Sequence, residues 1–270
     1  VGLLGLAISA VAGCHSGGSH GTAGAPGDSI FHTELLKKVT DSIARYPDSS
    51  RLYFERGGIL YVMKQYDLAG KDLQKAISLD PLKTDYYISL GEIALASDAF
   101  AAAAEAYRKA LALDASNQMA RLELAFVLFQ QSDFRGALRQ SDSLLAQDDK
   151  LVQAYGIKAR ALEALGDTAE ALRQLTRSVS LSPHNYDALM ATGDLLFHHR
   201  DTAALAYYRR AAASDTTQGE PLYCIGLVDE QTGRTSRALE AYRACIARDA
   251  YYLDAYLRMG AIMERDNDWQ

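Results

Sequence analysis

The sequence predicts an all-α array of stacked helix-turn-helix repeats, because two small-residue markers recur along the chain at one spacing. The first marker is a glycine or alanine, found at Gly57, Gly91, Ala125, Ala159, Gly193, Gly226 and Gly260. The second marker is an alanine, found at Ala69, Ala103, Ala137, Ala171, Ala204 and Ala238. Both markers advance by 34 residues, except for one step of 33 residues that falls in the same repeat for both. A period of this length is typical of helical repeat proteins.

The composition fits a soluble globular protein and argues against nucleic-acid binding. Of the 270 residues, 49% are hydrophobic and 23% are charged, which are ordinary values. The net charge of −6 does not suit a phosphate-binding groove, which needs concentrated Lys and Arg. Because repeat arrays grow by stacking, the length does not set the number of domains.

Residues 1–13 form an uncharged and mostly apolar leader, VGLLGLAISAVAG. This run is too short to span a bilayer as a helix, which takes about 20 residues, but it fits the apolar core of a secretory signal whose basic start is missing. Its end, Val11-Ala12-Gly13-Cys14, resembles the bacterial lipobox. That resemblance implies cleavage before Cys14, lipidation of its thiol and a membrane-anchored lipoprotein on the periplasmic side, with the outer membrane expected. The alternative is a chance apolar N-terminus with a free cysteine.

Residues 14–29 are expected to be the lipidated cysteine and a flexible tether, because His15 to Gly27 is rich in Gly and Ser. His15 and His20 are interpreted as solvated side chains of the tether, since two histidines on a flexible segment make a weak metal site. The chain begins at Val1 without Met and ends at Gln270 inside a predicted repeat. We therefore expect the natural protein to be longer.

Residues 30–47 are predicted to form an N-terminal capping helix. Asp28 or Ser29 can cap it, and Pro47 ends it. Its apolar side chains recur at three- and four-residue steps, as on one face of a helix, at Leu35, Leu36, Val39 and Ile43.

Each repeat in residues 50–251 is predicted to hold two amphipathic helices. In the second repeat, the residues of the first helix that share one face are Tyr87, Leu90, Gly91 and Ala94. After a turn at Ser97-Asp98, one face of the next helix carries Ala103, Tyr107 and Ala110. Small residues where the two helices cross allow close approach of their backbones.

This arrangement of an aromatic residue, Leu-Gly, Ala, a second aromatic residue, Ala and Pro resembles the tetratricopeptide repeat. The resemblance covers six repeats in residues 50–251 and implies a right-handed α-solenoid. Residues 252–270 would then be the first helix of a truncated seventh repeat, with Tyr256, Met259 and Gly260. The third repeat departs most from the pattern, because Arg121 replaces the aromatic residue and Ser141 the large residue of the second helix.

No catalytic, cofactor or metal motif is evident, so the chain is predicted not to be an enzyme and to need no cofactor. His198-His199 with Asp201 is the best metal candidate, but adjacent helical side chains point about 100° apart, which favours a polar helix end. Cys224 and Cys245 could pair in an exported protein, although small buried hydrophobic residues are the preferred interpretation.

The resemblance also implies a concave groove lined by the first helices of the repeats. The large apolar residues expected there are Phe54, Tyr61, Ile88, Leu122, Phe126, Phe129, Met190, Phe197, Tyr223 and Leu227, and other expected groove residues are Glu92, Leu95, Met119, Arg160, Glu163, Asp194 and Glu230. A solvated face would carry more charge, so these residues predict a hydrophobic groove for a peptide or helix of a partner. The alternative is that they only pack between repeats. Phe54 and Gly58 occupy positions where chaperone-binding repeats carry Lys and Asn, so that carboxylate clamp is absent.

The predicted function is a membrane-anchored scaffold that binds proteins or peptides of the bacterial cell envelope, with no nucleic-acid partner. The alternative is an envelope lipoprotein that binds glycan or peptidoglycan. The 16 tyrosines support that alternative only weakly, because seven of them are expected to be packing residues: Tyr53, Tyr87, Tyr155, Tyr256, Tyr107, Tyr208 and Tyr242. Trp269 is the only tryptophan.

Overall fold

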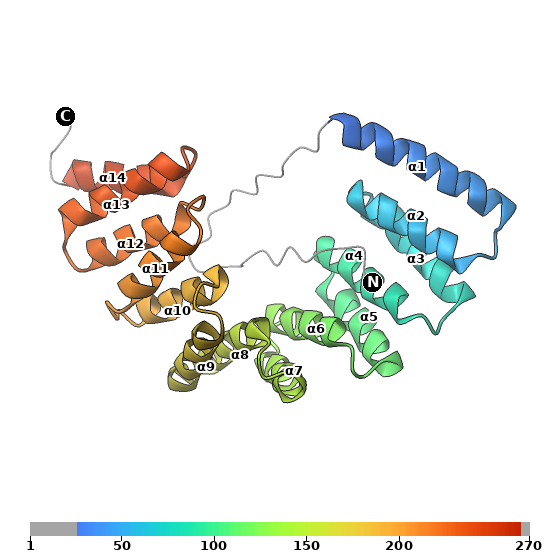
Figure 1. The fold of residues 1–270 in the computed structure, drawn as a ribbon, viewed down its shortest axis with the longest axis horizontal. Coiled ribbons are helices and arrows are strands. Elements are labelled where there is room, and N and C mark those ends of the chain that lie inside the picture. Colours follow the sequence, from blue (N-terminus) through green and yellow to red (C-terminus); the bar gives the residue numbers. More distant parts are fainter. Residues whose placement is uncertain (1–25, 266–270) are drawn as a thin grey trace. The chain divides into compact units, whose positions relative to one another are not determined.

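A computed structural model describes residues 26–265 of the chain, with side chains described from residue 33 onward. All regular structure in this range is α-helical (Figure 1), which confirms the all-α repeat fold. The helices are α1 (Pro26–Arg45), α2 (Ser50–Val62), α3 (Tyr66–Leu79), α4 (Thr84–Ala96), α5 (Phe100–Leu113), α6 (Gln118–Gln130), α7 (Phe134–Gln147), α8 (Val152–Ala164), α9 (Thr168–Leu181), α10 (Tyr186–His198), α11 (Ala204–Ser214), α12 (Glu220–Gln231), α13 (Thr235–Arg248) and α14 (Leu253–Arg265). The apolar leader, Cys14 and Trp269 lie outside the described residues.

None of the helices described by the structure is both long enough and apolar enough to cross a bilayer. The N-terminal helix begins at Pro26, four residues before the predicted start at Ile30, and it ends at Arg45 before Pro47. Proline is well suited to the first turn of a helix because its fixed φ is helical and its missing N–H would have no partner there. Pro221 likewise lies in the first turn of α12.

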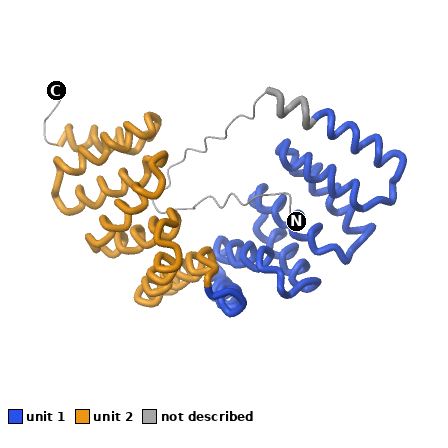
Figure 2. The backbone as a smooth tube through the Cα atoms, in the orientation of Figure 1, with its two compact units in different colours: residues 1–8, 18–149 blue, residues 9–17, 150–270 orange. Residues whose placement is uncertain are grey.

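The described residues divide into two compact units, residues 26–149 and residues 150–265 (Figure 2). Unit 1 contains α1 to α7, and unit 2 contains α8 to α14. In each unit the helices pack as pairs joined by a short turn, and each pair packs on the next. Within each repeat the second helix packs most closely on the first helix of the same repeat, as expected of helix-turn-helix repeats.

Glycine allows close helix crossing where the second helix presents a tyrosine. A Cβ added at Gly91 would lie 2.6 Å from Cε1 of Tyr107, so no larger residue fits without movement of the ring. Two further pairs show the same close approach to Cε1: Gly193 with Tyr208 at 2.5 Å, and Gly226 with Tyr242 at 2.3 Å. All three tyrosines are almost completely buried. In these three repeats the glycine of the first marker therefore leaves space for a tyrosine ring.

The third and fourth repeats fill the same space differently. Ala125 and Ala159 replace the glycine, and the second helices carry Ser141 and Leu175 instead of tyrosine. Ser141 is fully buried, and its hydroxyl donates a hydrogen bond of 3.0 Å to the carbonyl oxygen of Ala137. A larger residue on one helix is thus matched by a smaller one on the other, which keeps the crossing filled.

Each turn inside a repeat contains one residue with positive φ. In the fourth and sixth repeats it is Gly166 (φ +88°) and Gly233 (φ +74°). In the other four repeats a residue with a Cβ adopts this left-handed conformation: Lys64, Asp98, Ser132 and Arg200. This conformation costs roughly 1 kcal/mol for a residue other than glycine.

The missing residue of the fifth repeat is accommodated at the start of α11. The backbone N–H groups of Ala204, Leu205 and Ala206 each bond to the carbonyl three residues earlier, at 3.2, 3.1 and 3.0 Å. Such tighter turns are common at helix ends. As a result α11 has 11 residues, whereas α9 and α13 have 14.

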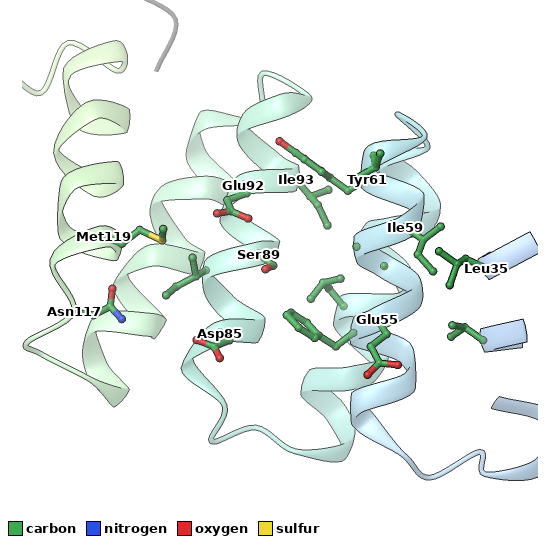
Figure 3. A pocket seen from close by; sticks show the side chains of 17 residues that line it. Leu35, Glu55, Ile59, Tyr61, Asp85, Ser89, Glu92, Ile93, Asn117 and Met119 are labelled. Carbon is green, nitrogen blue, oxygen red and sulfur yellow. The ribbon is translucent and has the colours of Figure 1, made fainter. Parts of the chain in front are cut away.

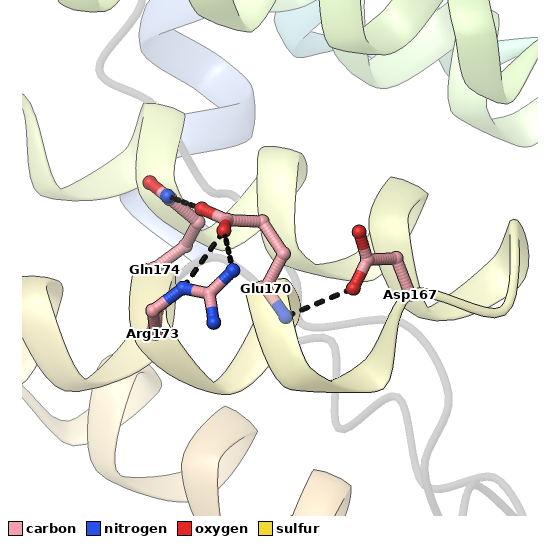
Figure 4. Close-up of polar contacts among 4 residues, drawn as sticks. All are labelled: Asp167, Glu170, Arg173 and Gln174. Atoms are coloured by element: carbon pink, nitrogen blue, oxygen red, sulfur yellow. Dashed lines mark hydrogen bonds and ion pairs between the residues drawn. The ribbon is translucent and has the colours of Figure 1, made fainter.

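Some helices of the repeats begin with a side-chain cap. The carboxylate of Asp167 accepts the backbone N–H of Glu170 at 3.1 Å (Figure 4). In the same turn, the Glu170 carboxylate accepts hydrogen bonds from Arg173 and Gln174. The bond from Arg173 lowers the pKa of Glu170. These exposed contacts add only a little stability, because surface ion pairs are screened by water.

Candidate functional site

The main candidate site is a pocket of about 590 Å³ in unit 1. It lies along the first helices of three successive repeats, α2, α4 and the start of α6, and α1 closes one side (Figure 3). We call it the unit 1 pocket. Its lining residues are Leu35, Val39, Phe54, Glu55, Gly57, Gly58, Ile59, Tyr61, Val62, Leu73, Asp85, Ile88, Ser89, Glu92, Ile93, Asn117 and Met119. Its volume is in the range of pockets that bind small molecules or peptide side chains.

The pocket follows from the helical spacing of its residues. On α2, Phe54, Gly58 and Tyr61 recur at three- and four-residue steps and therefore share one face. Phe54 packs its ring 5.0 Å from that of Tyr86, which fixes one wall. Gly58 opens the floor, since a Cβ added there would have no neighbour within 4 Å.

The charge of the pocket has one sign. Three of its lining residues are acidic, Glu55, Asp85 and Glu92, and none is Lys, Arg or His. Glu55 forms an ion pair of 2.8 Å with the exposed Arg51. In Figure 3, Glu92 and Tyr61 lie toward one end of the pocket, and Asp85 and Glu55 lie toward the other. The result is an apolar surface with carboxylates at both ends.

Glu92 is a partly desolvated carboxylate. Its burial, and to a smaller extent the charge of Glu123 on α6, raise its pKa to about 7. Burial also raises the pKa of Glu123. Burial and then the charge of Glu92 raise the pKa of Tyr61. Within the part of the chain that the structure describes, no cationic side chain pairs with Glu92 or Glu123 to offset the cost of burying their charges.

The hydroxyl of Tyr107 on α5 lies close to this acidic pair and is buried without a hydrogen-bond partner among the described residues. Burial raises its pKa above the ordinary value, and the charges of Glu123 and Glu92 add to the shift. A buried hydroxyl without a partner costs roughly 1–3 kcal/mol.

The first helices of unit 2 present a row of charged side chains. We call them the unit 2 polar row: Arg160, Glu163, Asp194, His198, Glu230 and Arg258. The row is internally paired. His198 Nδ1 lies 3.3 Å from Glu163 Oε1, and Arg258 lies 3.6 Å from Glu230.

Two buried tyrosines also donate to the polar row. The Tyr208 hydroxyl donates to Asp194 at 2.8 Å, and the Tyr242 hydroxyl donates to Glu230 at 2.7 Å. Burial raises the pKa of Asp194 to about 6, although the bond from Tyr208 acts in the opposite direction.

Three of the predicted groove residues, Phe54, Tyr61 and Ile88, meet in the unit 1 pocket together with Glu92 and Met119. Ile88 is itself buried, and so are four other predicted groove residues, in the packing between helices: Leu122, Met190, Tyr223 and Leu227. The remaining three, Phe126, Phe129 and Phe197, are half-buried, and the ring of Phe129 packs 5.4 Å from that of Phe134. For all ten residues the assignment to a binding groove stays a prediction.

Sequence reasoning missed the contribution of α1 to the pocket. Leu35 and Val39 were assigned to the apolar face of a capping helix, and the structure shows that this face closes the pocket beside α2. The three- and four-residue steps were the available signal, but they could not distinguish a buried face from a pocket wall.

The other candidates from the sequence have structural roles. His199 Nε2 lies 3.3 Å from Thr168 Oγ1, whereas His198 contacts Glu163, so the two histidines have different partners. Cys224 and Cys245 are both buried and form no disulfide. Burial raises the pKa of Cys245 to about 12. No group of three His, Cys, Asp or Glu side chains within residues 33–265 could hold a metal ion.

One packing assignment was wrong. Tyr256 was expected to be a packing residue, but it is 47% exposed. It lies on α14, which packs on α13. Tyr223, whose ring stacks with those of Tyr242 and Tyr252, belongs to the core of unit 2.

Comparison with known proteins identifies the repeat. A family model described as tetratricopeptide repeat matches residues 63–120, 122–183 and 158–219, which together make up more than half of the chain. A solved tetratricopeptide repeat protein from Parabacteroides merdae superposes with a TM-score of 0.70 over 87% of this chain and 94% of that protein, at 15% sequence identity. That likeness concerns the fold alone.

Two curated proteins are similar in sequence. The human mitochondrial import receptor subunit TOM70 is 19% identical over 222 residues, 79% of this chain and 36% of the receptor subunit. The type IV pilus assembly protein PilF of Pseudomonas aeruginosa is 30% identical over 125 residues, 44% of this chain and 49% of PilF. The chain therefore spans half or less of the length of these relatives.

Proposed function

Because the chain belongs to the tetratricopeptide repeat family, we propose that it is a scaffold that binds segments of partner proteins in the unit 1 pocket. The observation that carries this proposal is the pocket itself. It gathers apolar side chains from three successive first helices around one depression. Exposed apolar surface of this kind is typical of interaction sites.

The proposal includes an envelope location and a lipid anchor. Its support is the lipobox-like Val11-Ala12-Gly13-Cys14 and the Gly/Ser-rich segment that follows. One similar protein is named as a pilus assembly protein and another as a subunit of an import receptor. Both names describe proteins that act on other proteins at a membrane or in an assembly, and we extend this role to the present chain.

The pocket can be tested by filling it from within. Gly58→Leu places a side chain in the open floor of the pocket, where an added Cβ meets nothing within 4 Å. Because leucine favours helix more than glycine does, by roughly 0.8 kcal/mol, the variant is expected to be at least as stable as the native chain. Gly156→Leu is the matched control, since Gly156 is equally open but lies on α8 of unit 2.

The measurement is a crosslinking pull-down from envelope membranes with the native chain and both variants. We expect a partner protein that is captured by the native chain and by Gly156→Leu and lost with Gly58→Leu. Equal capture by all three chains would remove the pocket as the binding site. Glycan strands retained by all three chains, with no protein captured, would favour the glycan-binding alternative.

The anchor is tested separately by Cys14→Ser in the gene with its natural N-terminus. We expect the protein to move from the membrane fraction to the soluble fraction, because stable anchoring requires acyl chains on that thiol. Ser16→Ala, two residues away in the same segment, should leave the protein in the membrane. Retention of Cys14→Ser in the membrane would rule out lipid anchoring at this residue.

A further inference from the structure

We propose that the segment bound in the unit 1 pocket carries a large apolar side chain and, beside it, a lysine or arginine. The apolar side chain packs against Phe54 and Ile88, and the cation pairs with Glu92 and Glu123. This inference rests on the proposed function and specifies the chemistry of the partner.

The apolar half of the site is built for a side chain that the protein itself does not supply. Phe54, Ile59 and Ile93 come from two different helices and line the same depression. Between them the α2 backbone is bare at Gly58, so the floor has room for an incoming group. An apolar anchor that enters a preformed pocket is a common source of affinity in peptide recognition.

The acidic lining of the pocket favours a basic residue beside the apolar residue of the partner. Of the 17 lining residues three are acidic and none is basic. Glu92 lines one end of the pocket, and the charge of Glu123 on α6 acts on it; both carboxylates are partly desolvated, and neither pairs with a cation among the described residues. An incoming ammonium or guanidinium group would offset the desolvation of both and remove their repulsion. A partner with an acidic side chain at this position would increase the repulsion.

Comparison with unit 2 shows that Glu92 does not accept a hydrogen bond from the tyrosine of the following helix. Asp194 follows Gly193 directly and accepts the hydroxyl proton of Tyr208. Glu92 follows Gly91 in the same way, yet the buried hydroxyl of Tyr107 makes no hydrogen bond to it or to any other described residue. In unit 2 the carboxylate is part of the helix packing, whereas in unit 1 it lies on the pocket wall and remains available to a partner.

A second copy of this chain is a less suitable occupant than a basic segment. The chain has a net charge of −6, so its surface repels an acidic pocket on average. The complementary partner is a different protein with a basic and apolar segment.

The test selects random 12-residue peptides displayed on phage against the full chain. We expect the enriched sequences to share an aromatic or large aliphatic residue at a fixed distance from a Lys or Arg. The same selection on Glu92→Gln, Glu123→Gln, a variant that keeps the size and hydrogen-bonding capacity of both side chains, should retain the apolar residue and lose the preference for a base.

One enriched peptide is then synthesised with its Lys or Arg and with Gln in that place. On the native chain the replacement should weaken binding by about tenfold, and on the Gln variant by less than about twofold, since the ion pair is already absent. For the basic peptide on the native chain, affinity should also rise between pH 6 and pH 8 as Glu92 loses its proton.

The outcomes separate this inference from the proposed function. Peptides that are enriched on the native chain but not on Gly58→Leu, and that share no basic residue, would overturn the inference and keep the pocket as a protein-binding site. Equal losses from the Lys-to-Gln change on both chains would also overturn it. Failure of the native chain to enrich any peptide relative to Gly58→Leu would overturn both proposals.

Discussion

The two units share the same helix pairs but use their first helices differently. In unit 1 the exposed faces of α2 and α4 leave an apolar pocket with unpaired carboxylates. In unit 2 the corresponding faces carry charged residues that pair with one another and with buried tyrosine hydroxyls. Packing requirements therefore fix the inner positions of a repeat, whereas the outer faces of the first helices differ between the two units.

The largest effect should come from the glycines that accommodate the tyrosine rings. Gly193→Ala would bring a Cβ within 2.5 Å of Tyr208, and Gly91→Ala would bring one within 2.6 Å of Tyr107. We expect losses in unfolding free energy of about 3 and about 2 kcal/mol, respectively. The unit 2 loss is larger because the ring of Tyr208 is also held by Asp194. Urea denaturation of both variants checks this order, and a reversed order would contradict the comparison of the units.

Removal of the two tyrosine hydroxyls should change the unfolding free energy in opposite directions. Tyr208→Phe removes the donor to Asp194 and is expected to cost about 1–2 kcal/mol of unfolding free energy. Tyr107→Phe removes a buried hydroxyl without a partner and should leave stability unchanged or raise it by up to about 1 kcal/mol. Thermal denaturation of the two variants is the measurement. A loss for Tyr107→Phe as large as that for Tyr208→Phe would show that its hydroxyl has a partner after all.

The carboxylate of Glu92 should make stability depend on pH. Its pKa in the folded chain is raised from 4.5 to about 7, so its stabilising contribution is present below pH 4.5 and is lost as pH rises through 7. Glu92→Gln should remove this loss and stabilise the chain at pH 8 by about 1–2 kcal/mol, after allowance for solvent screening. Near pH 4.5 the native chain and the variant should differ little. Urea denaturation at both pH values decides, and a constant difference would contradict the raised pKa.

The smallest effect concerns the turns. Lys64 adopts a left-handed conformation in unit 1, whereas Gly166 occupies the corresponding turn of α8 and α9 in unit 2. Lys64→Gly should therefore stabilise the chain by about 0.5–1 kcal/mol, and Gly166→Ala should destabilise it by a similar amount. Both changes are measured by thermal denaturation. If both substitutions stabilised the chain, or both destabilised it, the two turns would not be equivalent.

Much of the fold could be predicted from the chain alone. The recurrence of Gly57, Gly91 and their equivalents predicted stacked helix pairs, because close crossings restrict residue size. The shortened start of α11 could not be predicted, since a missing residue shows only that a turn changed and not which hydrogen bonds replaced the lost ones.

The site was predicted in part. Phe54, Tyr61 and Ile88 were expected at a groove and do line the unit 1 pocket. The sequence could not show that Ile88, Leu122 and Met190 are all buried, nor that Ile88 nevertheless lines the pocket. Burial depends on the size of side chains from neighbouring repeats, and a single helix does not carry that information. The raised pKa of Glu92 could not be predicted either, because it depends on burial and, to a smaller extent, on the charge of Glu123, 31 residues away.

The matched sizes at the helix crossings limit how this chain can be recombined. Gly91 needs the ring of Tyr107 on the following helix, whereas Ala125 is accommodated by Ser141. A chimera joined at the turn inside a repeat would set alanine against tyrosine in one product and glycine against serine in the other, giving a clash and a void. A chimera joined between repeats, at Asp114 for example, keeps each matched pair intact. New binding faces could therefore be engineered by exchanging whole repeats.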